Sequence, residues 1–207
     1  EARFTDPKTV EAITKWAAMT NELGVSPNEA TRQAFGPNQM QEGFTAMTFF
    51  QYSSQVNTNE NFPDLEWDTV MVPKGFNGNP RVVPVIVNSW VIYSKAEQES
   101  KDAAWTFMKY YLSEEAQMIL AESGASLPVH VDALAAVEEM TDTNPSNKAA
   151  FTQGIAESGM TMDENPTWQE WRKAAEPIFI DISNGMISPE EGLEEINKQV
   201  QQVLDDA

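Results

Sequence analysis

A strand-like run followed at once by two helical segments constrains the fold of this chain most. Residues 83–93 (VPVIVNSWVIY) are β-branched and almost continuously apolar, which is typical of strands buried on both faces. Residues 101–128 then predict two helices and a turn that ends in Leu-Pro. The first of these helices carries apolar side chains at helical spacing: Ala104, Trp105, Met108 and Leu112. A buried strand that leads into helices indicates an α/β fold.

The rest of the chain continues this alternation of patterns. A helix is predicted to begin at Pro7, with Asp6 as its N-cap, and to end near Gly24. Two shorter apolar runs, residues 44–50 and 67–72, have the composition of buried strands. Near the C-terminus, Ser188 and Pro189 are followed by two glutamates, which together predict a capping box and a helix start. Apolar side chains then recur at helical spacing: Leu193, Ile196, Val200 and Leu204.

Composition and charge exclude several classes of partner. Of the 207 residues, 41% are hydrophobic and 22% are charged, which is typical of a globular protein. The formal net charge of −19 argues against binding to nucleic acid or to an anionic membrane surface. Because the chain has no cysteine, disulfides, thiolate nucleophiles and cysteine-ligated metals are excluded. No apolar run reaches the ~20 residues that a membrane-spanning helix needs.

The motif search finds no catalytic or metal-binding pattern. His130 is the only histidine, which excludes HExxH and histidine-rich metal sites, and its position predicts a surface histidine at a helix start. Adjacent acidic pairs such as Glu114-Glu115 diverge by ~100° on a helix, so we interpret them as solvated faces. We therefore predict no catalytic residue, no metal and no cofactor. Carboxylates that meet from distant segments leave a glycoside-active enzyme open as an alternative.

Aromatic side chains are the main candidates for ligand binding. The chain has six Trp, four Tyr and ten Phe, and aromatic rings stack on the C–H faces of sugars. Three tryptophans are assigned to the core from their apolar positions: Trp16, Trp67 and Trp105. Trp90 interrupts an apolar run with polar neighbours, while Trp168 and Trp171 stand at i and i+3 where a helix begins. These three are expected to contact ligand.

Six short motifs follow one another along the chain. They are residues 24–27 (GVSP), 42–47 (EGFTAM), 67–75 (WDTVMVPKG), 88–94 (NSWVIYS), 102–107 (DAAWTF) and 127–129 (LPV). In this order they resemble the extracellular solute-binding proteins of ABC importers, specifically the sugar-binding group that includes maltose-binding protein. The resemblance extends over most of the chain. Two places depart from it: Gln51-Tyr52-Ser53 stands where the family often has Gly-Ser-Trp, and Ile86-Val87 replaces a pair of glycines.

The resemblance implies an architecture. It is an α/β fold that forms part of a two-lobe, periplasmic-binding-protein-like structure of type II, mainly the C-terminal lobe with a smaller insertion from the N-terminal lobe. Residues 1–87 and 140–207 would belong to the C-terminal lobe, and residues 88–139 would cross the hinge into the N-terminal lobe. The chain would be a C-terminal fragment. Together with the aromatic candidates, the resemblance gives the expected ligand-contacting residues: Phe50, Gln51, Tyr52, Asn88, Ser89, Trp90, Trp168 and Trp171.

The resemblance also implies a function. The chain would capture a carbohydrate in an inter-lobe cleft by hinge closure, would deliver it to an ABC permease, and would not be an enzyme. The expected location is extracellular or periplasmic, with a lipid anchor on a missing N-terminus. Besides the glycoside-active enzyme, two alternatives are a wall-adhesion module and a receptor for a solute such as glycerol 3-phosphate. The latter would need a cation near the cleft, for which the candidates are Arg81, Arg172 and Lys173.

Missing opening strands would leave apolar surface uncovered. The residues expected to be exposed are Phe49, Val83, Val85 and Val87. Burying such side chains is worth roughly 1.5–3 kcal/mol each. We therefore predict that the 207-residue chain does not behave as an ordinary isolated monomer: it would pair with another copy, swap elements with it, or be part of a longer chain.

Overall fold

The computed structural model describes residues 1–161 and 165–207, apart from the side chain of Asn77. The chain divides into two compact units, of which unit 1 comprises residues 1–47 and 163–207 and unit 2 comprises residues 48–162. The predicted lobe segments, with boundaries after residues 87 and 139, concern a larger two-lobe molecule and remain a prediction. Among the described residues, none of the helices combines the length and the apolar content that crossing a bilayer requires.

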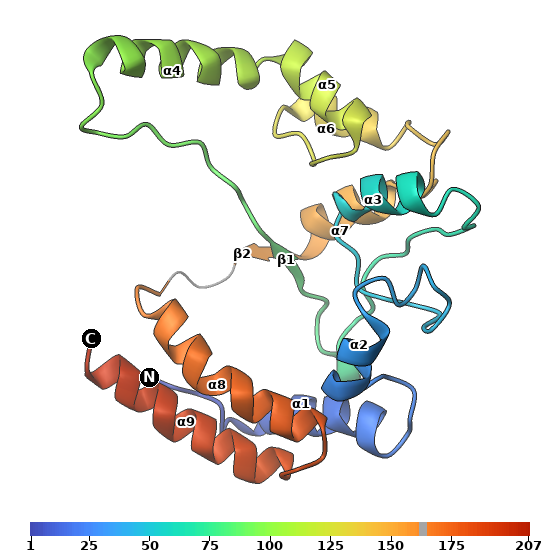
Figure 1. The fold of residues 1–207 in the computed structure, drawn as a ribbon, viewed down its shortest axis with the longest axis vertical. Coiled ribbons are helices and arrows are strands. Elements are labelled where there is room, and N and C mark those ends of the chain that lie inside the picture. Colours follow the sequence, from blue (N-terminus) through green and yellow to red (C-terminus); the bar gives the residue numbers. More distant parts are fainter. Residues whose placement is uncertain (162–164) are drawn as a thin grey trace. The chain divides into compact units, whose positions relative to one another are not determined.

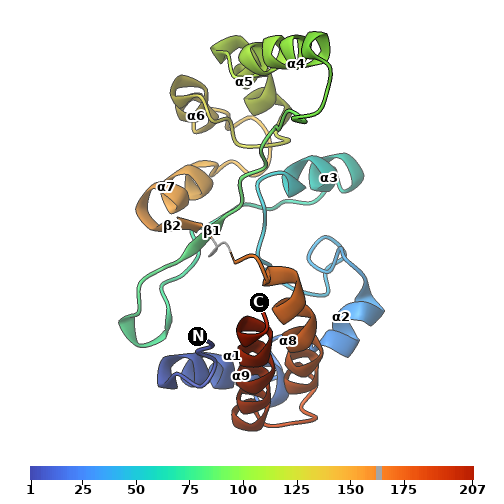
Figure 2. The same cartoon turned by 90° about the vertical axis from the view of Figure 1, so that its left-hand side faces the viewer.

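Unit 1 is helical and joins the two ends of the chain. Its helices are α1 (Pro7–Asn21), α2 (Glu29–Phe35), α8 (Trp168–Ser183) and α9 (Pro189–Asp205). Helices α8 and α9 lie side by side, and α1 packs against both (Figure 1, Figure 2). The N-terminal segment is fixed to α9 because the backbone N–H groups of Ala2 and Phe4 donate to the side chains of Gln201 and Asn197, both at 2.9 Å.

A small apolar core holds these helices together. Its buried members are Ala17, Ala175, Ile182, Leu193, Ile196 and Val200. Gly192 allows α9 to approach α8 closely, because a Cβ atom at this position would lie 2.5 Å from Ile182 Cδ1. The core reaches the outer face of α8 through Trp171 and Phe179, which are half-buried against it.

The predicted starts of α1 and α9 are confirmed. Asp6 Oδ1 accepts a hydrogen bond from Lys8 N at 2.9 Å, with Pro7 at the first helical position. Ser188 Oγ accepts from Glu191 N at 3.2 Å, and the Glu191 carboxylate accepts from Ser188 N at 3.4 Å, which completes the capping box. Both helix starts are fixed by side chains within a few residues, which is why the sequence predicts them.

Unit 2 combines short helices with one strand pair. Its elements are α3 (Ser54–Asn61), η1 (Phe76–Gly78), β1 (Val83–Val85), α4 (Gln98–Tyr111), α5 (Glu114–Ser123), α6 (Val131–Val137), α7 (Ala149–Ser158) and β2 (Gly159–Thr161). Strands β1 and β2 pair in parallel, with Val83 opposite Gly159. The buried apolar cluster of this unit consists of Tyr52, Ala121 and Val137, with Leu127, Met140 and Phe151 packed against it.

The loop before α7 is fixed by two charged side chains. Lys148 is 3% exposed, and its ammonium group donates to the carbonyl oxygens of Met140, Thr143 and Pro145 at 2.6–2.9 Å. Asp68 accepts from the backbone N–H of Asn147 and from the hydroxyl of Ser146, both at 2.8 Å. Burial raises the pKa of Asp68, but these hydrogen bonds outweigh it and hold the pKa below its usual value.

The strand predictions are largely wrong. Residues 44–50 and 67–72 are irregular, and of the run 83–93 only β1 pairs with another strand. Of the four residues predicted to be exposed, Phe49 is 85% and Val87 67% exposed, whereas Val83 and Val85 are half-buried. A strand needs a neighbour to accept its ladder of hydrogen bonds, and in the described residues β2 is the partner of β1. Prediction from apolar composition alone therefore gave more strand residues than the described part of the chain contains.

Two of the three tryptophans assigned to the core are exposed. Trp105 is 55% exposed, and α4 contributes no buried residue. Trp16 is 39% exposed because its neighbour Ala17 occupies the buried position of α1. Trp67 is half-buried, with its ring 4.7 Å from that of Phe50. His130 is half-buried and lies immediately before α6, so its predicted position at a helix start is confirmed.

Candidate functional site

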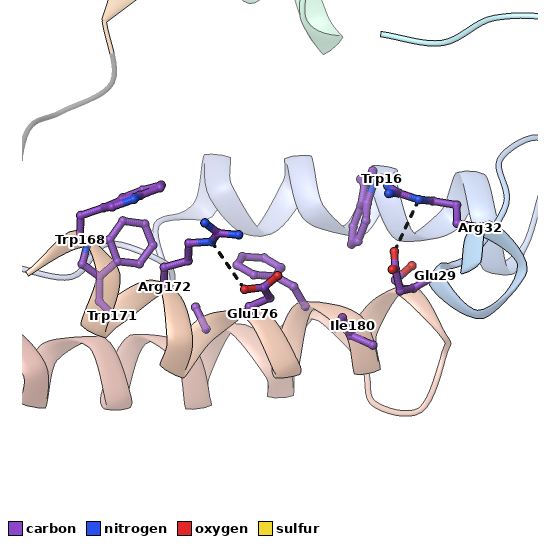
Figure 3. Close-up of a pocket in the computed structure, with 11 residues that line it drawn as sticks. Trp16, Glu29, Arg32, Trp168, Trp171, Arg172, Glu176 and Ile180 are labelled. Carbon is purple, nitrogen blue, oxygen red and sulfur yellow. Dashed lines mark ion pairs between the residues drawn. The ribbon is translucent and has the colours of Figure 1, made fainter. Parts of the chain in front are cut away.

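An open pocket lies on unit 1 where α1, α2 and α8 face one another (Figure 3). Its volume is about 420 Å³. Small-molecule sites in proteins typically measure ~300–1,000 Å³, so this pocket has room for a small ligand or for part of a larger one. Ala175 and Ile180 form apolar parts of its lining, and Ala175 also belongs to the buried core. The core of the unit therefore supports the pocket directly.

Aromatic rings line one end of the pocket. Trp168 is the first residue of α8, and its ring centroid lies 4.7 Å from that of Trp171 with an interplanar angle of 87°. Trp171 is anchored on its other side by Phe4, at 6.2 Å between centroids. At the other end of the pocket Trp16 stands on α1 (Figure 3). The spacing of Trp168 and Trp171 by three residues places both rings on neighbouring parts of the helix surface.

The start of α8 is held in place by the segment before it. Asn165 Oδ1 accepts hydrogen bonds from both the backbone N–H and the hydroxyl of Thr167, at 2.9 and 2.7 Å. The backbone N–H of Trp168 donates to the carbonyl of Asn165 at 3.0 Å. This local turn fixes the backbone from which Trp168 projects, so the aromatic end of the pocket is preformed.

The charged side chains of the pocket are paired within their own helices. Arg172 Nε lies 3.5 Å from Glu176 Oε2 on α8, and Arg32 Nε lies 3.6 Å from Glu29 Oε2 on α2 (Figure 3). The two cations and the two anions of the lining balance each other. Such exposed pairs are weak, so their donors and acceptors can exchange to a ligand. An apolar surface with a balanced polar rim suits a neutral ligand that carries hydroxyl groups.

The structure brings two of the predicted ligand-contacting residues together. Trp168 and Trp171 both line the pocket and touch each other. Asn88 and Ser89 lie in unit 2, in the irregular segment after β1, and are exposed. Trp90 follows them and is 57% exposed, with its ring 5.5 Å from that of Phe107. Their convergence with the tryptophans of unit 1 remains a prediction.

The other three candidates precede α3 in unit 2. Gln51 is exposed, and Phe50 is half-buried against Trp67. Tyr52 is 7% exposed and packs edge-on against Phe151, with ring centroids 5.3 Å apart. Burial raises the pKa of Tyr52, which keeps the phenol neutral. In this structure Tyr52 serves as a core residue of unit 2, and its predicted contact with ligand remains a prediction.

Sequence reasoning missed several residues of the pocket. Trp16 was assigned to the core, and Arg32 was not considered. Arg172 was considered only as a partner for an anionic solute. A signal for Arg172 was present, because it lies four residues after Trp168 and four before Glu176, on one helix face. No local signal marks Trp16 and Arg32, because their place in the pocket depends on how α1 and α2 pack beside α8.

One family model matches this chain, and two solved structures resemble its fold. The family described as "Bacterial extracellular solute-binding protein" matches residues 2–152. A search of curated proteins found no match. Among solved structures, an ABC substrate-binding protein of Listeria monocytogenes in complex with cycloalternan has a TM-score of 0.79 and 19% identity, over 99% of this chain and 51% of that one. The cyclic α-maltosyl-1,6-maltose binding protein of Arthrobacter globiformis has a TM-score of 0.68 and 18% identity, over 99% and 50%.

These likenesses support the predicted α/β fold. At 18–19% identity the two structures speak to the fold, which is that of substrate-binding proteins. The chain spans about half the length of either one.

Proposed function

We propose that this chain, which belongs to the bacterial extracellular solute-binding proteins, takes part in capturing a carbohydrate for ABC import. The family match covers most of the sequence, so the predicted membership is confirmed. The family and the similar structures are substrate-binding proteins, which agrees with the expectation that the chain is not an enzyme. The proposal also includes delivery of the captured carbohydrate to a membrane permease.

The observation that carries the proposal is the tryptophan-lined pocket of unit 1. Indole rings offer flat apolar faces on which the C–H groups of a pyranose ring can stack. The paired charges beside them supply donors and acceptors for hydroxyl groups without a net charge. The names of the two similar structures mention cycloalternan and cyclic α-maltosyl-1,6-maltose, which further favours a sugar.

An anionic solute such as glycerol 3-phosphate is a weaker candidate. Arg172 and Arg32 each have a carboxylate partner within 3.6 Å, so a phosphate group would have to displace Glu176 or Glu29. The formal charge of −19 also opposes the approach of an anion. Arg81, the other arginine predicted as a candidate for this role, lies in unit 2 and pairs with Glu157 at 3.3 Å.

Capture of the carbohydrate is proposed to involve both lobes of the expected two-lobe structure. Ligand stabilises a closed state only if it contacts residues that move relative to one another. Trp90 is a candidate in unit 2 because the residue is 57% exposed, and the exposed Asn88 and Ser89 beside it offer hydrogen bonds. Membership of an extracellular family supports a location outside the cytoplasmic membrane, and a lipid anchor is part of the proposal.

Isothermal titration of the chain with a panel of linear and cyclic gluco-oligosaccharides tests the proposal. We expect saturable binding of at least one oligosaccharide, and at least tenfold weaker binding by Trp168→Ala, which corresponds to ~1.4 kcal/mol. Trp105→Ala is the matched control, because Trp105 is also an exposed tryptophan but lies outside the pocket. Its affinity should stay within twofold of the unmodified chain.

Three outcomes would contradict the proposal. The first is binding of glycerol 3-phosphate with no response to any sugar. The second is hydrolysis of an oligosaccharide during the titration, which would indicate an enzyme. The third is equal loss of affinity in Trp168→Ala and Trp105→Ala.

A further inference from the structure

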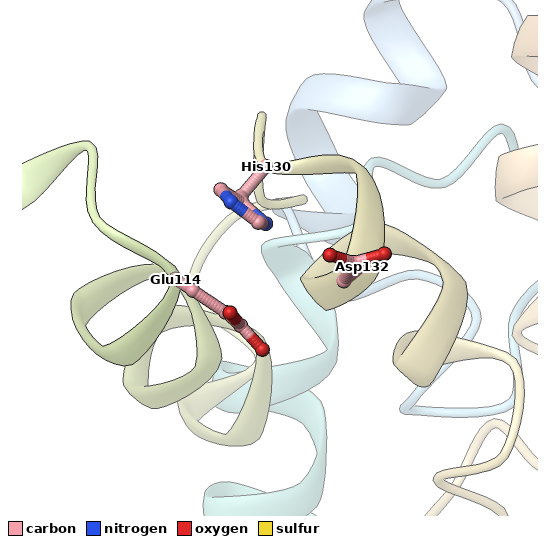
Figure 4. Close-up of side chains that lie close together, drawn as sticks. All are labelled: Glu114, His130 and Asp132. Atoms are coloured by element: carbon pink, nitrogen blue, oxygen red, sulfur yellow. The ribbon is translucent and has the colours of Figure 1, made fainter.

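Three side chains with metal-ligating atoms meet where two helices of unit 2 begin. Glu114 is the first residue of α5, His130 immediately precedes α6, and Asp132 is in the first turn of α6. One ligating atom from each of them lies within 4.8 Å of the other two (Figure 4). Both carboxylates are exposed, so an ion can reach them from solvent. From this arrangement we propose that the three residues bind a divalent transition-metal ion of the zinc type.

The distances suit a metal ion after small side-chain movements. Zinc lies about 2.0–2.2 Å from imidazole nitrogen and carboxylate oxygen. Two of its ligand atoms are therefore separated by roughly 3.4 Å in tetrahedral geometry, and by at most ~4.4 Å when they lie on opposite sides of the ion. The ligating atoms here are within 4.8 Å of one another, and the exposed Glu114 and Asp132 can rotate inward. Three protein ligands leave a position for water.

The backbone that presents the ligands is fixed by a buried glutamine. Gln117 is 1% exposed and lies one turn after Glu114 on α5. Its Oε1 accepts a hydrogen bond from the backbone N–H of Val129 at 2.7 Å, and its Nε2 donates to the carbonyl of Tyr111 at 2.8 Å. Gln117 thereby joins the segment just before His130 to the segment just before Glu114. The ligands are held by a preformed frame, as tight metal sites require.

Ordinary helix electrostatics explains only part of this cluster. A carboxylate in the first turn of a helix is favoured by the helix dipole, so Glu114 and Asp132 need no ion for their positions. The imidazole is different, because Nδ1 of His130 is buried and no hydrogen bond reaches it within the described part of the chain. Buried polar atoms are rarely left without a partner, and a metal ion bound at Nδ1 would supply one.

The donor set selects the class of ion. One imidazole with two carboxylates matches the preference of zinc and similar first-row ions, whereas calcium and magnesium favour sites made only of oxygen. The chain has no cysteine and no second histidine, so no other imidazole or thiolate competes for such an ion. No metal was predicted from the sequence, because short motifs do not reveal ligands that lie far apart in the chain. Glu114 and His130 are 16 positions apart. A bound ion would link the starts of α5 and α6.

The single histidine makes the test direct. Tag-free chain is titrated with zinc chloride by calorimetry, and the ring signals of His130 are followed by NMR in the same titration. We expect one zinc ion per chain and saturable shifts of the imidazole signals. His130→Gln and Glu114→Gln should each weaken binding at least tenfold. Glu115→Gln removes the same charge from the same helix turn outside the cluster, so its affinity should stay within threefold.

Two results would overturn the proposal. One is an imidazole spectrum that does not change up to 1 mM zinc, which would exclude His130 as a ligand even if some variant failed to fold. The other is binding by His130→Gln as tight as by the unmodified chain. In that case the ions would be attracted only by the acidic surface, whose formal charge is −19.

Discussion

Replacing Ile196 by alanine is expected to destabilise unit 1 and to loosen its pocket. Ile196 is 0% exposed in the core between α8 and α9. The change removes three carbon atoms, worth ~0.8 kcal/mol each on transfer, or about 2.4 kcal/mol. A cavity of roughly 60–80 Å³ at ~24 cal/mol per Å³ adds about 1.5–2 kcal/mol. The expected loss of unfolding free energy is therefore about 4 kcal/mol.

Urea denaturation and hydrogen exchange together measure this loss and locate it. Amide protection should fall in α8 and α9 of Ile196→Ala, while the protection of α5 and α7 in unit 2 should stay as in the unmodified chain. Lys198→Ala is the matched control on α9, because that side chain is 79% exposed and should change stability by less than ~0.5 kcal/mol. A loss below ~1 kcal/mol for Ile196→Ala, or equal losses for the two variants, would refute the assigned core.

Three further predictions concern local features. Ser188→Ala removes the capping box of α9 and should cost about 1 kcal/mol in thermal denaturation; an unchanged melting temperature would contradict the observed hydrogen bonds. Because Asp68 has a pKa below its usual 3.8, its stabilisation is present above that pH and is lost as the pH falls through the lower folded value. The stability difference between the unmodified chain and Asp68→Asn should therefore shrink from about pH 5 to about pH 2, and a constant difference would argue against this role. Exposed apolar residues on α4, such as Trp105 and Phe107, predict concentration-dependent self-association in sedimentation velocity, and a monodisperse monomer would contradict it.

Helix boundaries were predictable because the groups that fix them are close in sequence. Asp6 and Pro7 stand next to each other, and Ser188 is three residues from Glu191. Each start is decided by a hydrogen bond within one turn, so neither depends on the rest of the fold. The amphipathic pattern of α9 was equally informative, since Leu193, Ile196 and Val200 all lie in the core.

Strands were poorly predicted because their partners lie far away in sequence. β1 pairs with residues 159–161 (GMT), a segment that carries no strand pattern. The more strongly apolar residues 86–93, by contrast, form no strand. A run of β-branched residues indicates the capacity for strand pairing, but a neighbouring strand must be present to realise it.

The candidate pocket was predictable only where one helix supplies it. Trp168 and Trp171 were found from their spacing at the start of α8. Trp16 was not, because its exposure depends on the packing of α1 against α8, which no short segment encodes. The cluster of Glu114, His130 and Asp132 has the same origin, since α5 and α6 must pack together before the ligands meet.

The most direct test of the account follows the six tryptophan indole N–H signals by NMR during titration with an oligosaccharide that binds. Signals are assigned with single Trp→Phe variants. We expect saturable shifts of Trp168 and Trp171 and an unchanged signal for Trp105, which is exposed but outside the pocket. Saturable binding that leaves Trp168 and Trp171 unshifted would contradict it, because the sugar would then be bound elsewhere.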